Sequence, residues 1–272
     1  ARLSQEAAQV SSFALRLLDR PGGRGRYLFE RNVMSHRRTW AIIVSGFFEP
    51  LFYLLALGYG LGGYVGDVVI DERAIEYASF VAPALLAASA FNGAFYDATN
   101  IFWKLKYQKT YDAVLATPLG PKDIASGETA FALFRGLIYA VGFFSLMLAL
   151  GLIHSWWGVL ALPATVFIGF AFAGAGIAAV TYMRSWQDFD TLNLAILPMF
   201  LFSATFFPLS TYPDWLETVI RLTPLYHGVE LLRALTTGAV GAGQLVNVAY
   251  LALLGLAGTL IAGRRVEKLL LT

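Results

Sequence analysis

The stretch KLKYQKTYDAVLATPLGPKDIASGE, residues 104–128, is a polar island between two long apolar segments. Residues 110–116 can form a short helix that Thr117-Pro118 would end, because proline disfavours the α conformation in the residue before it. Asp123 is then placed to cap the next helix, since a short carboxylate accepts hydrogen bonds from free N–H groups at a helix start. We therefore expect a short helix followed by a turn between two membrane spans, placed where a partner outside the membrane can contact it.

The composition is that of a membrane protein. Of the 272 residues, 57% are hydrophobic and 14% are charged, whereas a soluble domain is about 45–50% apolar and about 25% charged. The chain has no cysteine, which excludes a disulfide framework and a thiolate metal site. Most of the chain is therefore expected to lie in lipid.

Six segments are apolar enough to cross a bilayer, which takes about 20 residues of helix. They are residues 40–61, 77–103, 125–152, 158–183, 191–207 and 245–263. The predicted fold is an all-α integral membrane domain over residues 40–272, preceded by amphipathic helices over residues 1–39. In the fourth segment, glycines and alanines such as Gly169, Gly174 and Gly176 predict a small-residue face that lets neighbouring helices approach closely.

The N-terminal amphipathic part contains a segment at residues 27–39 that is predicted to lie in the membrane surface. Its polar side carries Arg31, Arg37 and Arg38, and its apolar side carries Tyr27, Leu28, Val33 and Met34. A soluble tail helix is the alternative interpretation.

Loop charges predict the orientation, because Lys and Arg stay on the cytoplasmic side. Positive residues are concentrated before residue 40, in the 104–124 loop, at Arg184 and in the C-terminal tail, whereas residues 62–76, 153–157 and 208–244 hold few. Six spans with both termini in the cytoplasm satisfy every loop.

The outer segment, residues 208–238, is divided by Pro208, Pro213 and Pro224 into two short helical pieces. Pieces of this length are too short to span and suit re-entrant or interfacial helices. Within them, Glu230 and Arg233 form an i, i+3 pair, which on a surface is worth only about 0.2–0.5 kcal/mol. The alternative is that this pair lines the exit of a pathway.

Ionisable residues inside spans are costly and are candidates for function. Glu49 lies within the first span, and Glu128 and Arg135 lie seven residues apart on one face of the third. For each, a packing role in a network between helices is the alternative to a role in a pathway. Phe95 belongs to a run of aromatic side chains on the second span, a subset of which could stack on sugar rings or drugs.

Motifs for chemistry are missing from the sequence. It contains no G-x-x-x-x-G-K-[ST] phosphate loop, no metal-ligand spacing and no nucleophile–base cluster. We therefore predict no catalytic residue, no metal and no cofactor in this chain. If the protein uses ATP, another chain must bind it.

Three stretches carry a resemblance to a known family. They are LATPLGPKDI at 115–124 followed by Gly127-Glu128, EPLFYLLALGYGLG at 49–62, and FSATFFPLSTYPDWL with LTPLYHGVELLR at 202–216 and 222–233. With the six spans and the N-terminal amphipathic helix, they resemble the type-2 ABC exporter permeases (ABC-2 type). Within that family, the chain looks similar to the nodulation-factor (lipo-oligosaccharide) and daunorubicin-type export permeases.

The resemblance implies a dimer of permeases, identical or different, in a bacterial cytoplasmic membrane, with two separate subunits that bind ATP and Mg²⁺. It implies a coupling helix against the ATPase with contacts from Tyr111, Asp112, Leu115, Pro118 and Lys122, and an interface helix at 27–39. Candidate pathway or network residues are Glu49, Phe95, Glu128 and Arg135. Candidate residues of an outer gate in the 213–235 pair are Trp215, Glu230 and Arg233.

The substrate implied by the resemblance is amphipathic, either a lipid-linked glycan or lipo-oligosaccharide or a hydrophobic drug, and it would be exported from the cytoplasm or the inner leaflet. No nucleic-acid partner is expected. The resemblance leaves residues 1–20 unexplained. From another class, an integral membrane enzyme or scaffold is the alternative, and the lack of a catalytic cluster disfavours it.

Overall fold

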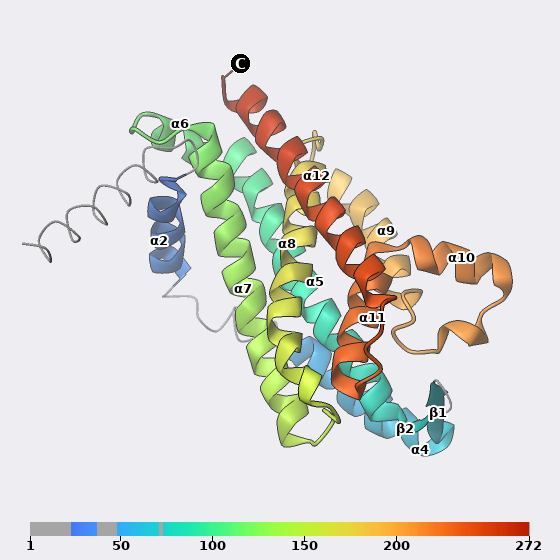
Figure 1. The fold of residues 1–272 in the computed structure, drawn as a ribbon. Helices are drawn as coiled ribbons and strands as arrows, with labels where there is room; N and C mark the ends of the chain where they lie inside the picture. The colour runs from blue at the N-terminus through green and yellow to red at the C-terminus, as the bar shows by residue number, and fades with distance from the viewer. Residues whose placement is uncertain (1–22, 37–47, 71–72, 272) are drawn as a thin grey trace, which may run out of the picture.

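The computed structural model describes residues 23–36, 48–70 and 73–271. The predicted helix at 1–20, together with Arg37, Arg38 and the first part of the predicted first span, lies outside these residues. Within them, the chain folds into a bundle of helices with one small hairpin (Figure 1).

The helices that form the bundle are long and apolar. They are α5 (Tyr77–Lys106), α7 (Pro121–Ala149), α8 (Ala161–Val180) with the preceding 3-10 turn η3 (Trp156–Leu160), and α12 (Gln244–Leu271). Among the described residues, these four units are long and apolar enough to cross a membrane. They correspond to the second, third, fourth and sixth predicted segments.

The first and fifth predicted spans are less complete. Residues 48–53 are helical and continue through a π-helical stretch, η2 (Leu54–Leu61), into α4 (Gly62–Val65). The fifth segment is α9 (Asp188–Leu201), only 14 residues long, and its C-terminal part contains Pro198. Residues 202–207, predicted as helix, form turns in which Ala204 has a positive φ of 54°. The structure thus supports four spans by length and does not establish six.

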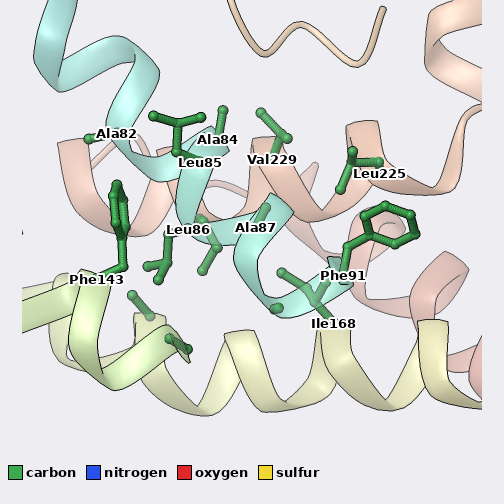
Figure 2. Close-up of a cluster of buried hydrophobic side chains, with 14 of the residues drawn as sticks. Ala82, Ala84, Leu85, Leu86, Ala87, Phe91, Phe143, Ile168, Leu225 and Val229 are labelled. Atoms are coloured by element: carbon green, nitrogen blue, oxygen red, sulfur yellow. The ribbon is translucent and has the colours of Figure 1, made fainter. Parts of the chain in front are cut away.

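Helix α5 is the central element of the bundle. Its side chains from Tyr77 to Ala90 are all buried, and many are alanines that let helices approach from several sides. Figure 2 shows Leu85, Leu86 and Phe91 of α5 between Phe143 of α7, Ile168 of α8 and residues of α11 (Pro224–Thr237). The burial of residues 77–90 on every side matches their largely apolar composition, as expected of a helix segment surrounded by others.

The predicted small-residue face of the fourth segment is confirmed. A Cβ atom added to Gly258 of α12 would lie 2.5 Å from the backbone nitrogen of Ala175 on α8, and one added to Gly174 would lie 2.8 Å from the Gly255 oxygen. Only glycine permits this approach, so α8 and α12 pack backbone to backbone.

The outer segment contains two short helices, as predicted. They are α10 (Asp214–Leu222) and α11, preceded by the turn η4 (Leu209–Thr211). Pro213 directly precedes α10, and Pro224 is the first residue of α11, where its missing N–H has no helical partner to lose. Leu225, Val229 and Leu232 are fully buried, so one side of α11 packs into the core.

A hairpin at the same end was not predicted. Strands β1 (Asp67–Ile70) and β2 (Arg73–Glu76) are antiparallel, with Asp67 opposite Glu76. Gly66, with a φ of 73°, ends α4 and turns the chain into β1. The alternation in DVVI is too short for its period to be distinguished from a loop.

The positively charged segments gather at the other end of the bundle, which we call the basic end. It contains α2 (Gly25–His36), the end of α5, α6 (Thr110–Leu115), the start of α7 and the last turns of α12 (Figure 1). A small apolar core joins these elements, made of Leu28, Ile101, Tyr111, Val114, Ile124, Ile177, Ala178, Ala262 and Val266. The charge partition predicted from the loops is therefore present in the fold.

Candidate functional site

The polar stretch at residues 104–128 forms the predicted short helix. Helix α6 follows Lys109, which has a left-handed φ of 47°, and its last turn closes at Ala116, before Pro118. The cap prediction for Asp123 was wrong in position: α7 begins at Pro121, so Gly120 is the capping residue and Asp123 lies in the first turn. Its carboxylate still accepts a hydrogen bond from the Gly120 N–H at 2.9 Å.

Glu128 joins four elements beneath α6. Its carboxylate is 1% exposed and accepts hydrogen bonds from Lys104 Nζ of α5 at 2.7 and 2.9 Å. It also accepts one from Asn32 Nδ2 of α2 and one from Tyr111 Oη of α6, each at 3.0 Å. A single acid on α7 therefore holds α2, α6 and the end of α5.

The protonation state of Tyr111 fits this role. Burial raises the pKa of the Tyr111 phenol well above its usual value, and the adjacent Glu128 carboxylate raises this pKa further. The hydroxyl is therefore a permanent donor at neutral pH. A carboxylate with charged and neutral donors on several sides has most of its lost hydration replaced, which is the condition for burying a charge.

A second ion pair lies one layer deeper. Arg135 Nη1 is 3.1 Å from Asp97 Oδ1, and Arg135 Nε donates to Tyr139 Oη at 2.9 Å. The predicted network with the second span is thus present. Glu128 and Arg135 do not contact each other as partners; each pairs with its own residue on α5.

The two pairs together define the register of α5 against α7. The helices are antiparallel, and Lys104 opposes Glu128 as Asp97 opposes Arg135, with seven residues, about 10 Å, between layers on both helices. A slip of two turns would place acid against acid or base against base. A slip of one turn would separate both ion pairs.

Only part of the predicted coupling set faces outward. Asp112, Pro118 and Lys122 are exposed and Leu115 is half-buried, whereas Tyr111 is 1% exposed and faces the core. Tyr111 is therefore an internal anchor of α6. We call the exposed side of α6 and the turn after it, residues 112, 113 and 116–118, the handle face.

The predicted interface helix α2 lies against α7. Leu28 and Asn32 are buried, but Tyr27 and Met34, predicted on the same apolar side, are exposed. A Cβ atom added to Gly127 of α7 would lie 2.6 Å from the Gly25 oxygen, which shows how closely the two helices approach. Burial of Asn32 instead of Met34 follows from its bond to Glu128.

At the opposite end, the predicted pair of Glu230 and Arg233 forms, but its expected place on the surface was wrong. Arg233 is 5% exposed; it donates to the Ala204 oxygen at 2.6 Å and stacks on the Phe80 ring at 4.0 Å. Glu230 Oε1 lies 2.6 Å from Arg233 Nη1. The guanidinium thus ties α11 to α5 and to the turn after α9, while Trp215 is 69% exposed on α10.

The remaining two candidates lie apart from these networks. Glu49 is exposed on the helix at residues 48–53. Phe95 is buried in the main core, its ring 5.5 Å from that of Phe91. Among the described residues, no group of three His, Asp or Glu side chains is arranged to hold a metal ion.

Sequence reasoning missed Asn32, Lys104 and Asp97. Lys104 was counted only as a loop charge, and Asp97 was not singled out. The sequence did contain a signal. An acid is followed seven residues later by a base at Asp97 and Lys104, and the same pattern recurs at Glu128 and Arg135.

A bundle of long apolar helices that carries an anchored polar helix at one end defines a polytopic membrane protein. Residues 25–237 match the ABC-2 type transporter family, and the chain belongs to that family, the membrane component of a transporter.

Several bacterial proteins are similar to this chain. Nodulation protein J of Sinorhizobium fredii is 31% identical over 229 residues, 82% of this chain and 85% of that protein. Nodulation protein J of Rhizobium leguminosarum bv. trifolii is 31% identical over 224 residues, 80% and 84% of the two chains. The inner membrane transport permease YadH of Escherichia coli is 21% identical over 214 residues, 76% and 80%.

Proposed function

We propose that this chain is the permease subunit of an ATP-driven exporter, with six spans and both termini in the cytoplasm. The family supports a separate subunit that binds ATP and Mg²⁺. The gathering of lysines and arginines at the basic end supports placing that end in the cytoplasm. The handle face would contact the ATP-binding subunit.

The observation that carries this proposal is the attachment of α6 through Glu128. A six-residue helix has little stability of its own in water, yet this one is fixed to α2, α5 and α7 through one buried carboxylate. Such attachment is what a part that transmits force requires, since a push on a loosely held loop would only deform the loop.

The proposed movement follows from the same contacts. When the ATP-binding subunits close, they would displace α6, and α5 and α7 would move with it because two ion pairs hold their register. Rigid helices that shift between two packed arrangements are a usual means of switching in proteins. In a dimer of permeases this shift would open the seam between the two copies.

We further propose that the substrate is an amphipathic lipo-oligosaccharide or lipid-linked glycan. The similarity to Nodulation protein J over about four-fifths of each chain supports this class. Glu49 is proposed to face the pathway, because its carboxylate is exposed on the first helix of the isolated chain. Phe95 is proposed near the pathway, and the α10–α11 pair, with Trp215, Glu230 and Arg233, as the outer closure.

The coupling role is tested by reversing the charge of Asp112 on the handle face. Asp112→Lys, in the full transporter reconstituted in liposomes, should abolish ATP-driven export while the spans remain folded. The control is Asp190→Lys, which changes another exposed acid, near the start of α9. Full transport and full association with the ATP-binding subunit in the Asp112 variant would contradict the assignment of α6.

The substrate class is tested by analysing what copurifies with the transporter. Lipid-linked saccharide is expected, and its export should require ATP. Recovery and ATP-driven export of a hydrophobic drug alone would assign the chain to efflux instead. Glu49→Gln should lower export without loss of assembly, and unchanged export would return Glu49 to a packing role.

A further inference from the structure

A groove opens between α7 and α12 at the basic end of the bundle. Its volume is about 710 Å³, within the range of about 300–1,000 Å³ typical of ligand sites. Lys122, Arg264 and Glu267 line it near the helix ends, and Leu133, Phe170 and Leu260 line it further in. Glu128 and the handle face are not part of it.

The groove has the shape and polarity of a site for an amphiphile. Lys122 and Leu133 lie eleven residues apart on α7, so the lining extends about 16 Å along that helix. The charged side chains lie where the basic end meets water, and the apolar ones lie toward the middle of the spans. A molecule that fills the groove must therefore have a charged end and an apolar tail.

The charges at the rim favour a single negative charge. Neither Lys122 nor Arg264 has an acidic partner within 4.0 Å among the described residues, in contrast to Lys104 at the same end. With Glu267 included, the three ionisable side chains sum to +1. A headgroup of charge −1 neutralises this sum, whereas a zwitterionic headgroup leaves it unbalanced.

We propose that this groove binds a singly anionic phospholipid of the surrounding leaflet, with its phosphate at Lys122 and Arg264 and one acyl chain between α7 and α12. Basic pockets between membrane helices recognise anionic headgroups in this way. The site goes beyond the transport function and needs neither ATP nor a second subunit. Because α7 also carries Glu128, a bound lipid would stabilise the position of α7 and, through Glu128, that of α6.

Native mass spectrometry of the purified full chain tests the proposal. The probes are phosphatidylglycerol and phosphatidylethanolamine with identical acyl chains. One cation near the membrane surface contributes about 5-fold in affinity for an anionic lipid. We therefore expect phosphatidylglycerol to bind about 5-fold more tightly to the natural chain, in line with a net charge of +1.

Three variants set the direction of the effect. Lys122→Gln with Arg264→Gln leaves only Glu267 and a net charge of −1, so it should abolish the preference and reverse it, to about 5-fold in favour of phosphatidylethanolamine by the same scale. Glu267→Gln, which raises the net charge to +2, should increase it to about 25-fold by the same scale. The control, Lys106→Gln with Arg184→Gln, removes two exposed cations that do not line the groove, one at the end of α5 and one in the loop after α8, and should leave the preference unchanged.

Several outcomes would overturn the proposal. They are equal binding of the two lipids to the natural chain, a preference that survives loss of Lys122 and Arg264, or an equal loss in the control. Failure of Glu267→Gln to raise the preference would also count against it. Displacement of the lipid by inorganic phosphate alone would show a small-anion site without a lipid.

Discussion

Replacing Glu128 by Gln tests whether one buried carboxylate holds the polar helix in place. The change keeps the shape of the side chain but removes the charge that pairs with Lys104 and brings an NH₂ group toward three donors. Breaking a buried ion pair by removing one partner costs about 3–5 kcal/mol. The Lys104 side chain is 15% exposed and can regain water, so we expect about 2–3 kcal/mol here.

The cost should appear first in α6 and not in the whole bundle. A six-residue helix opens locally once its anchor is lost, so the amide hydrogens of residues 110–116 should report the change. A loss of about 2–3 kcal/mol corresponds to roughly 30- to 140-fold faster exchange of these amides. Hydrogen–deuterium exchange with peptide resolution, on the full chain in detergent, measures this directly.

Companion variants rank the contributions of the individual contacts of Glu128 to the stability of α6. Lys104→Met leaves the carboxylate buried and charged, so it should cost more than Glu128→Gln, about 3–5 kcal/mol. Tyr111→Phe removes one hydrogen bond to a charged group, about 1.5 kcal/mol. Glu30→Gln, an exposed acid on α2, is the control and should stay within about 0.5 kcal/mol. Exchange in α6 that changes less than about three-fold in Glu128→Gln would refute the anchoring argument.

Three further predictions concern the bundle and the alkaline range. Arg135→Met should lower the free energy of unfolding by about 3–5 kcal/mol in an SDS titration. Adding Asp97→Leu should recover most of this loss, because two apolar side chains can replace a buried ion pair. An equal loss in the double variant would be evidence against the pair. Gly258→Ala should destabilise the protein by about 1–3 kcal/mol, because the added methyl group overpacks against α8. Gly263→Ala has open space at its Cβ and should stabilise the protein by up to about 1 kcal/mol. Similar effects at both sites would contradict the close approach of α12 to α8. Because the pKa of Tyr111 is higher in the folded than in the unfolded chain, the contribution of Tyr111 to stability is complete below about pH 10 and is lost as the pH rises above that value. Above pH 10, the Tyr111→Phe variant should therefore lose less stability than the natural chain. Parallel loss of stability in the two proteins at alkaline pH would exclude this linkage.

The parts of the fold that depend on local pattern could be predicted from the sequence. The apolar segments, the short helix ended by Thr117-Pro118 and the proline-divided outer pair all follow from length, periodicity and backbone restriction. Four of the apolar segments appear as helices of spanning length. The fifth was predicted too long, because hydropathy does not detect the turn at Ala204.

The partners of the charged residues could not be predicted in the same way. Periodicity states which face of a helix a residue lies on, but not which helix it meets. Arg233 illustrates this: its i, i+3 neighbour of opposite charge suggested a surface pair, yet the guanidinium is buried and also binds carbonyl oxygens 153 and 29 residues away in sequence. Asn32 likewise is buried on the side of α2 that faces Glu128 because of a bond spanning 96 residues.

Stability alone does not explain why α5 and α7 are joined by two ion pairs. Well-packed apolar side chains in their place are often neutral or stabilising, and close contact is already present where a Cβ atom on Gly93 would lie 2.7 Å from Gly136 Cα. Apolar surfaces, however, pack nearly as well after a one-turn slip, whereas alternating charges on both helices penalise every register but one. We infer that the pairs are retained for register, so that displacement of α6 moves α5 and α7 as one body. On this reasoning the double variant Asp97→Leu/Arg135→Met should unfold like the natural chain and still transport poorly, and a variant that is both stable and fully active would show that register is set elsewhere.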